Sequence, residues 1–410
     1  MAIETVGYSR GSPGGQKNTI FITVLVFSIY FPAYFLIDDS NPARYFMYIV
    51  PLLALSEHFI RNRAAIYRSA WMLLGVFSVI YGFGVIQNGL FGLKEYLFVF
   101  LSIFTFAIPF RTQSLSPSII LFCGFSLAIG RILFYGSASP SISLFASSRG
   151  VAESSFGLVM PLLAIVFYLK RRWIGFLLAI LVAWMMFKRI ALAGLALALA
   201  LDYVLMLCRP GCSTERLALI IRLILLICAV AISLNSLQFY EWVSSAIYSL
   251  FEIRFSPNQI SSGRYYSTSV FLDFWREDLN LLAIIFGKGP GFSTKFLQTS
   301  PILIQNHFPL LHNDFLRILV DYGAIGLLGV CIGFVWAFKA GRTAAAFATY
   351  TLVLFMTDNA ATYLVYWISC FFLIRSQYLD HMATEAISWR KPGKNYLDVF
   401  GGNRPSVRRT

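Results

Sequence analysis

Long apolar runs separated by short polar segments recur along most of this 410-residue chain. A helix that crosses a bilayer needs about 20 mostly apolar residues, because its backbone polar groups must be satisfied within the segment itself. Many of the runs reach that length, whereas the alternating segments of about 10 residues that a membrane β-barrel requires are absent from the sequence. Hydrophobic residues make up 58% of the chain and charged residues only 13%, against about 25% charged in a typical soluble domain. The sequence therefore predicts an all-α polytopic membrane protein.

Twelve of the runs are candidate transmembrane helices. They cover residues 19–37, 45–60, 69–87, 96–110, 117–135, 156–169, 173–187, 190–208, 217–237, 315–338, 344–358 and 361–374. The predicted organisation is an N-terminal tail at 1–18, nine helices within 19–237, a long polar loop at 238–311, three helices within 312–374 and a basic C-terminal tail at 375–410. Tryptophans and Gly-Pro turns in the long loop predict that it folds into a small cap.

Most clusters of Lys and Arg in the short connections lie on one side of the membrane if the twelve runs cross it. Arg61 and Arg63 follow the second run, Lys170 and Arg171 the sixth, and Arg209 the eighth. Cytoplasmic loops carry such an excess, so both termini are expected in the cytoplasm and the 238–311 loop outside. The same clusters account for the net charge of +14, and binding of nucleic acid is not expected.

Basic residues on the outer side are few and are therefore informative. Four of the stretches that carry them stand out: "SSRGVAESSFG" with Arg149 and Glu153, "MMFKRIALAG" with Arg189, "SSGRYYSTSVFLDFW" with Arg264, and "LHNDFLRILVDYG" with His312 and Arg317. An arginine buried near the hydrocarbon costs a few kcal/mol, so an anionic partner is expected.

Each stretch also has a purely structural explanation. Arg149 can flank a loop, and Arg189 can extend to the lipid headgroups. Arg264 can pair with acidic residues of the cap, and His312 can flank a helix that Asn313 caps. In a helix bundle, however, all four stretches end at the same outer interface, and this convergence favours a shared site.

Such a site is suited to an anion. Arginine forms bidentate hydrogen bonds with phosphate oxygens, and a helix N-terminus attracts anions, so a lipid diphosphate at membrane level is the expected ligand. Histidine titrates near pH 6.5, and His312 could accept a proton from a hydroxyl, with Asn313 or Asp314 orienting its ring. The arginines would stabilise the diphosphate as it leaves. Together these features predict glycosyl transfer from a lipid diphosphate carrier.

Neither a metal nor another cofactor is expected. The sequence offers no pair of carboxylates and no His/Cys cluster on the outer side that would form a ligand set. Arginines could carry the phosphate charge instead.

At these stretches the chain resembles the bacterial O-antigen polymerase and O-antigen ligase superfamily, and the resemblance extends over most of its length. The family signature is a His followed by Asn, Ser or Gln, nine residues, a Gly, two residues and a second Gly, which His312, Asn313, Gly323 and Gly326 match. "SSGRYYSTSVFLDFW" resembles the family's Ser-Gly-Arg segment, "GKGPGF" its Gly-rich turn, and "KRIALAGLALAL" the basic start of a helix of small residues. The four segments occur in the family's order.

The resemblance implies a GT-C-like glycosyltransferase of the bacterial inner membrane that works without a metal. Its donor would be an undecaprenyl-diphosphate-linked glycan, and the 238–311 loop would be a periplasmic cap. The implied roles are catalysis for His312 and diphosphate binding for Arg189 and Arg264. Further candidates are Arg149 and Arg317 for the diphosphate, with Asn313, Asp314 and Glu153 in support.

Polymerases and ligases take glycan from the same carrier and differ in the acceptor. A polymerase passes the glycan to the next carrier-linked repeat, whereas a ligase passes it to lipid A-core. The stretch "RGVAESSFG" resembles a Glu-Pro-Ser variant associated with polymerases, with Ser154 in place of Pro. Polymerisation of O-antigen or exopolysaccharide repeats is therefore the first expectation and ligation the alternative. A chain-length regulator is a further candidate partner.

A transporter, such as a flippase for lipid-linked oligosaccharides, is the rival from another class. Transporters usually contain paired repeats and helices broken near the midplane of the membrane. The sequence shows no such repeat and predicts no broken helix, and its outer basic residues gather at the membrane edge. An enzyme is therefore favoured.

Overall fold

The computed structural model describes residues 68–107, 117–135, 155–186, 189–207, 212–261, 263–277, 279–299, 311–363, 366–367, 369–370 and 373–374. Within this part of the chain all regular secondary structure is helical. The bundle helices are α3 (Arg68–Ala107), α4 (Pro117–Tyr135), η2 (Ser155–Leu158), α5 (Met160–Leu169), α6 (Trp173–Met185), α7 (Arg189–Leu207), α8 (Cys212–Leu234), α15 (Asp314–Lys339), α16 (Arg342–Thr357) and η3 (Ala360–Thr362).

Three of these helices, α7, α8 and α15, are long and apolar enough to cross a membrane. Large apolar side chains also face outward from the bundle: Val79 is 81% exposed, Ile174 78% and Ile227 68%. An apolar surface of this kind is unfavourable in water but is expected where lipid covers it. The prediction of an α-helical membrane protein is confirmed at this level. The helix ends agree closely for α4, which matches the predicted run 117–135, and for α15, which extends the run 315–338 by one residue at each end, whereas α8 begins five residues before the predicted run 217–237.

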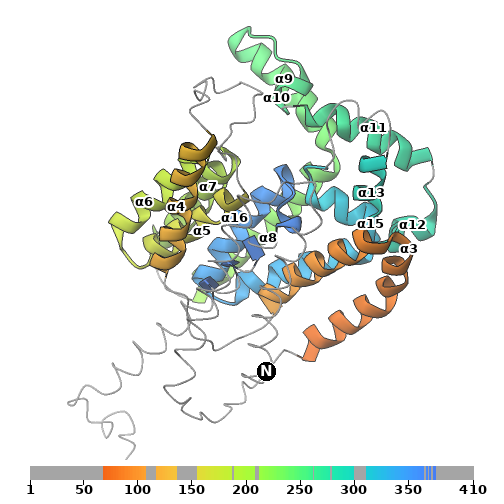
Figure 1. Ribbon diagram of the computed structural model, residues 1–410, viewed down its shortest axis with the longest axis horizontal. Coiled ribbons are helices and arrows are strands. Elements are labelled where there is room, and N and C mark those ends of the chain that lie inside the picture. The colour runs from red at the N-terminus through yellow and green to blue at the C-terminus, as the bar shows by residue number, and fades with distance from the viewer. Residues whose placement is uncertain are drawn as a thin grey trace, which may run out of the picture.

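The helices form two groups that meet at the centre of the molecule (Figure 1). α15 packs against α3, α8 and α16, and α16 packs in turn against α7 and α5. Gly194 of α7 lies where a Cβ atom would be 2.9 Å from the ring of Tyr350, so the two helices approach closely there. Eight residues nearer the start of α16, its Arg342 and Asp202 of α7 form two hydrogen bonds of 2.9 and 2.7 Å. The two helices are therefore antiparallel.

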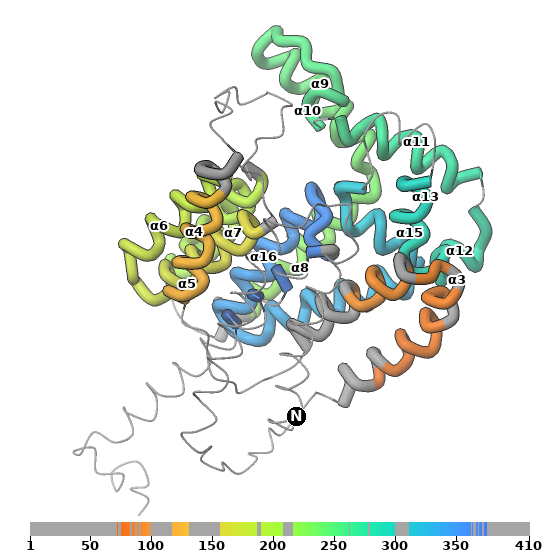
Figure 2. The backbone as a smooth tube through the Cα atoms, viewed as in Figure 1, coloured from red at the N-terminus to blue at the C-terminus, as the bar shows by residue number. Residues whose placement is uncertain are grey.

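The stretch 236–299 forms a helical cap. Its helices are α9 (Ser236–Phe251), α10 (Pro257–Ile260), α11 (Arg264–Glu277), α12 (Leu281–Phe286) and α13 (Phe292–Thr299). They run along one edge of the bundle from α9 to α12, as the tube in Figure 2 shows. Phe271 and Leu297 of the cap share a small apolar core with Leu316 and Val320 of α15. The cap is thus fixed to the first turns of α15, which is where the candidate site lies.

Two helices are broken, and only the break in α15 lies inside a predicted run. α3 bends sharply at Gly89 (φ 61°), so that the predicted runs 69–87 and 96–110 form the two arms of one element (Figure 1). α15 breaks at Gly323 (φ 65°), where a Cβ atom would lie 2.3 Å from the carbonyl oxygen of Ile285 in α12. A positive φ is easily adopted only by glycine, which explains both positions. The prediction of an unbroken helix is wrong for α15, whereas the bend in α3 falls in the predicted connection between the runs 69–87 and 96–110.

The Gly-rich turn 287–291 fills the break in α15. Lys288 N–H donates to Val320 O at 2.8 Å, and Gly289 N–H donates to Asp321 O at 3.0 Å. The Asp321 carboxylate accepts from Gly291 N–H and Ser293 N–H at 3.1 and 2.8 Å. On its other side the turn touches α3, where Asn88 donates to Pro290 O at 3.0 Å. Since buried backbone carbonyls need partners, this turn satisfies the groups that the break exposes.

Candidate functional site

The start of α15 is shaped by its N-terminal cap. Asn313 has an extended backbone, and its side-chain oxygen accepts from Leu316 N–H at 3.1 Å, as the sequence predicted for this residue. Its side-chain amide donates to Ser233 O at 2.8 Å, which ties the start of α15 to the end of α8. His312 precedes the cap, so it stands just outside the helix.

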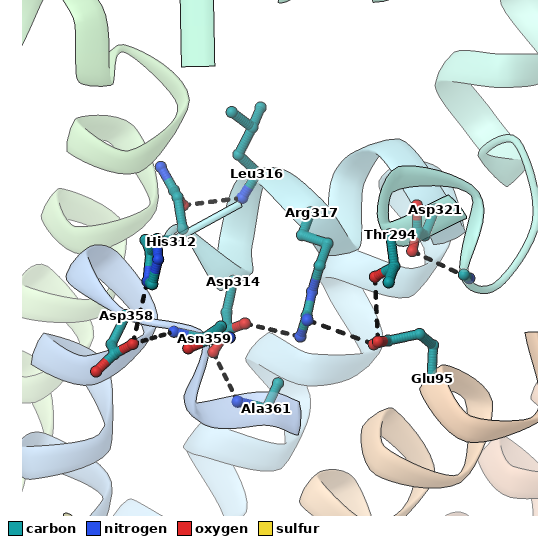
Figure 3. Close-up of polar contacts among 12 residues, drawn as sticks. Glu95, Thr294, His312, Asp314, Leu316, Arg317, Asp321, Asp358, Asn359 and Ala361 are labelled. Atoms are coloured by element: carbon teal, nitrogen blue, oxygen red, sulfur yellow. Dashed lines mark hydrogen bonds and ion pairs between the residues drawn. The ribbon is translucent and has the colours of Figure 1, made fainter. Parts of the chain in front are cut away.

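His312 faces a buried carboxylate. Its Nδ1 atom lies 3.3 Å from Oδ1 of Asp358, whose side chain is 1% exposed. The same Oδ1 accepts from Asn359 N–H at 2.9 Å, so the carboxylate is held from its own turn (Figure 3). His312 itself is 24% exposed. The ring is therefore oriented on one side and reachable from outside.

The residues expected to orient His312 have other partners. Asn313 caps α15, and Asp314 accepts from Ala361 N–H at 2.7 Å through Oδ2. Asp314 Oδ1 lies 2.7 Å from Nη2 of Arg317, which is itself 3% exposed. The orienting carboxylate is that of Asp358, and this differs from the expectation because Asp314 points into the bundle (Figure 3).

Arg264 reaches the same place from the cap. It is the first residue of α11, and its guanidinium donates to the carbonyl of Thr357, the residue before Asp358. Tyr240 of α9 is close enough to be affected: burial raises the pKa of Tyr240, and the Arg264 charge opposes that rise. Arg264 and His312 are therefore brought together around the end of α16.

Arg189 stands at the first position of α7. Because α7 and α16 are antiparallel, and Gly194 is level with Tyr350 and Val353, the start of α7 lies near the end of α16. This places the Arg189 backbone at the same end of the bundle as Asp358. Arg149 and Glu153 lie outside the described residues.

Two further charged residues of the region, Asp358 and Glu95, were not among the predicted site residues. Asp358 is the last residue of the predicted run 344–358, where a carboxylate is ordinarily solvated. Glu95, 1% exposed, lies 3.4 Å from Arg317 Nη1 and accepts from Thr294 at 3.2 Å. The only signal in the sequence was that both acidic residues border apolar runs on the predicted outer side.

The arrangement combines a histidine held by a carboxylate with an arginine at the edge of the cap. A neutral imidazole with Nδ1 bound to a carboxylate presents Nε2 for proton transfer. Among the described residues, no group of three or more His, Cys, Asp and Glu side chains is arranged to hold a metal ion. No family model matches the chain, and no curated protein matches it.

Proposed function

We propose that this protein is an inner-membrane glycosyltransferase that moves a glycan from undecaprenyl diphosphate to an acceptor hydroxyl at the periplasmic face. Polymerisation of O-antigen or exopolysaccharide repeats is the reaction that we favour. The observation that carries the proposal is the pairing of His312 with buried Asp358, with Arg264 bound one residue away at Thr357. A general base and a cation that can bind phosphate are the two groups that this transfer requires.

In the proposed reaction, the acceptor hydroxyl oxygen attacks the anomeric carbon of the donor sugar. The bond between that carbon and the diphosphate oxygen breaks, and the diphosphate leaves with the bonding electron pair. His312 takes the hydroxyl proton through Nε2 while Asp358 stabilises the resulting imidazolium, as a buried carboxylate does in other proton-transfer sites. Arg264 and Arg189 stabilise the charge on the leaving diphosphate.

The broken helices do not favour the transporter. In transporters the unwound backbone lines a cavity that holds the substrate. Here two carbonyls at the break in α15 accept from the turn 287–291, and a third, that of Tyr322, accepts from the Tyr81 hydroxyl. The break is packed by the protein's own backbone, which is expected of a structural bend.

We further propose twelve spans, a GT-C-like arrangement and a periplasmic cap. With the native cysteines replaced, a cysteine at the exposed Ser245 of α9 should react with a membrane-impermeant thiol reagent in cells with a permeabilised outer membrane. A cysteine at the exposed Ala340, between α15 and α16, should react only after the inner membrane is opened. Labelling in the reverse pattern would place the site in the cytoplasm and refute the proposed orientation.

The reaction itself can be tested with purified protein in lipid nanodiscs and a synthetic undecaprenyl-diphosphate-linked repeat unit. A polymerase should yield carrier-linked dimers and longer products from this donor alone, and turnover should persist in EDTA. Product that forms only when lipid A-core is added would identify a ligase. Absence of product with either acceptor would contradict glycosyl transfer, and activity that EDTA abolishes and Mg²⁺ restores would contradict the metal-independent mechanism.

A further inference from the structure

Arg317 is enclosed by carboxylates. It is 3% exposed; Nη2 lies 2.7 Å from Asp314 Oδ1, and Nη1 lies 3.4 Å from Glu95 Oε2. A ligand phosphate could bind this guanidinium only by displacing a buried carboxylate, which would then lack a cation and be strongly disfavoured. The position of Arg317 therefore suits a role within the protein rather than contact with a substrate.

Asp314 connects Arg317 to the turn that carries Asp358. One oxygen of its carboxylate faces Arg317, and the other accepts from Ala361 N–H at 2.7 Å. The turn 358–361 is thus held against the start of α15 at two points: Asp358 meets His312, and Ala361 meets Asp314 (Figure 3). The second contact fixes the register of the turn, and with it the place of Asp358.

We propose that Asp314 and Arg317 are positioning residues for His312: they hold the turn 358–361 so that Asp358 faces the Nδ1 atom of the ring. This inference rests on the proposed function in that His312 is taken as the reacting group. Glu95 extends the arrangement, because it holds Arg317 from α3 and accepts from Thr294 of the cap. Three elements distant in the sequence thereby set the orientation of one histidine.

The substitution Asp314→Asn tests this link with little change in shape. A carboxylate has two acceptor oxygens, whereas an amide has one and presents an N–H₂ group in place of the other. Asparagine therefore cannot satisfy both Arg317 and Ala361 N–H. Arg317 keeps its pairing with Glu95 in this variant, so no buried charge is left without a partner of opposite sign.

The reactivity of His312 gives a readout that does not require glycan transfer. Diethyl pyrocarbonate modifies neutral imidazole, and modification of the His312 peptide can be followed by mass spectrometry at pH 6. A facing carboxylate favours the protonated ring, so we expect His312 to react at least threefold faster in Asp314→Asn than in the unmodified protein. In an Asp358→Asn background the same substitution should have little further effect, because the contact on which it acts is already lost.

Asp202→Asn is the matched control. Asp202 is 4% exposed and binds Arg342 through both oxygens at the other end of α7 and α16, so its loss should leave His312 reactivity unchanged. If Asp314→Asn fails to insert, the triple variant Glu95→Gln, Asp314→Asn, Arg317→Met removes the three charges together and should show the same acceleration. His312 reactivity that stays at its original level in the variant that inserts would overturn the inference.

Measuring glycan transfer as well as His312 modification distinguishes a failure of this inference from a failure of the proposed function. If the protein transfers glycan but the rate of His312 modification is the same in Asp314→Asn as in the unmodified protein, the positioning role is refuted and the function stands. If reactivity changes as expected but the unmodified protein transfers no glycan, the positioning role stands and the function is refuted. With both intact, Asp314→Asn should lower kcat at least tenfold while the KM for the lipid-linked donor changes less than twofold, whereas a diphosphate ligand would mainly raise KM.

Discussion

His312→Ala should abolish glycan transfer while the protein remains folded and inserted. General base catalysis contributes about 10²–10⁴-fold to a rate, and alanine has no group that could take the hydroxyl proton. Folding should be little affected, because His312 precedes the cap of α15 and is 24% exposed. Transfer by purified variant protein, normalised to the amount extracted from membranes in a single oligomeric peak, is the measurement.

His307→Ala is the control for this substitution. It removes an imidazole from the same connecting stretch, five residues earlier, and lies outside the described residues. We expect activity within twofold of the unmodified protein. Near-normal product from His312→Ala would mean that the histidine only flanks the helix, and the proposed mechanism would then be wrong.

Arg264→Lys should reduce donor use at least tenfold, which corresponds to about 1.4 kcal/mol. Lysine keeps the charge but loses the planar fork that can bind the Thr357 carbonyl and a phosphate at the same time. The effect should fall mainly on the KM for the lipid-linked donor, because the guanidinium is proposed to bind the diphosphate before and during the reaction. Steady-state kinetics over a range of donor concentrations would measure it.

Arg254→Lys provides a comparison within the same cap. Arg254 is exposed and lies over the ring of Tyr248 at 5.2 Å, away from the end of α16. Its replacement should change donor KM less than twofold. Equal losses in the two variants would indicate a general effect on the cap, and Arg264 would then have no special part in recognition.

Sequence periodicity and capping rules predicted much of the local structure. The apolar run and the Asn cap placed the start of α15 within one residue, because both signals are carried by neighbouring residues. The break at Gly323 was not predicted, since it depends on the turn 287–291, which comes from a distant part of the chain. An isolated glycine in an apolar run gives no sign of such a contact.

The candidate site was only partly predictable for the same reason. The outer position of His312 and Arg264 follows from the order of the apolar runs. The partner of each side chain does not follow from that order, because it depends on how the helices pack. Arg317 was assigned to a phosphate because its buried partners, Glu95 and Asp314, could not be distinguished from solvated acidic residues. The role of Asp358 could be recognised only from the packing of the end of α16 beside the start of α15, which brings its carboxylate to His312.

The turn 287–291 also imposes an order on biosynthesis. Asn88 and Pro290 are 202 residues apart, and Glu95 and Thr294 are 199 apart. At about 5–20 residues per second, the ribosome needs roughly 10–40 s to make the partners of α3 after α3 itself has emerged. During that time Arg317, which pairs with Glu95, has not yet been made, and the bend at Gly89 lacks the turn that packs against it. The second arm of α3 can therefore reach its final burial only late in synthesis, and a chain that stops before α15 should be recognised by membrane proteases through the unfinished surroundings of α3.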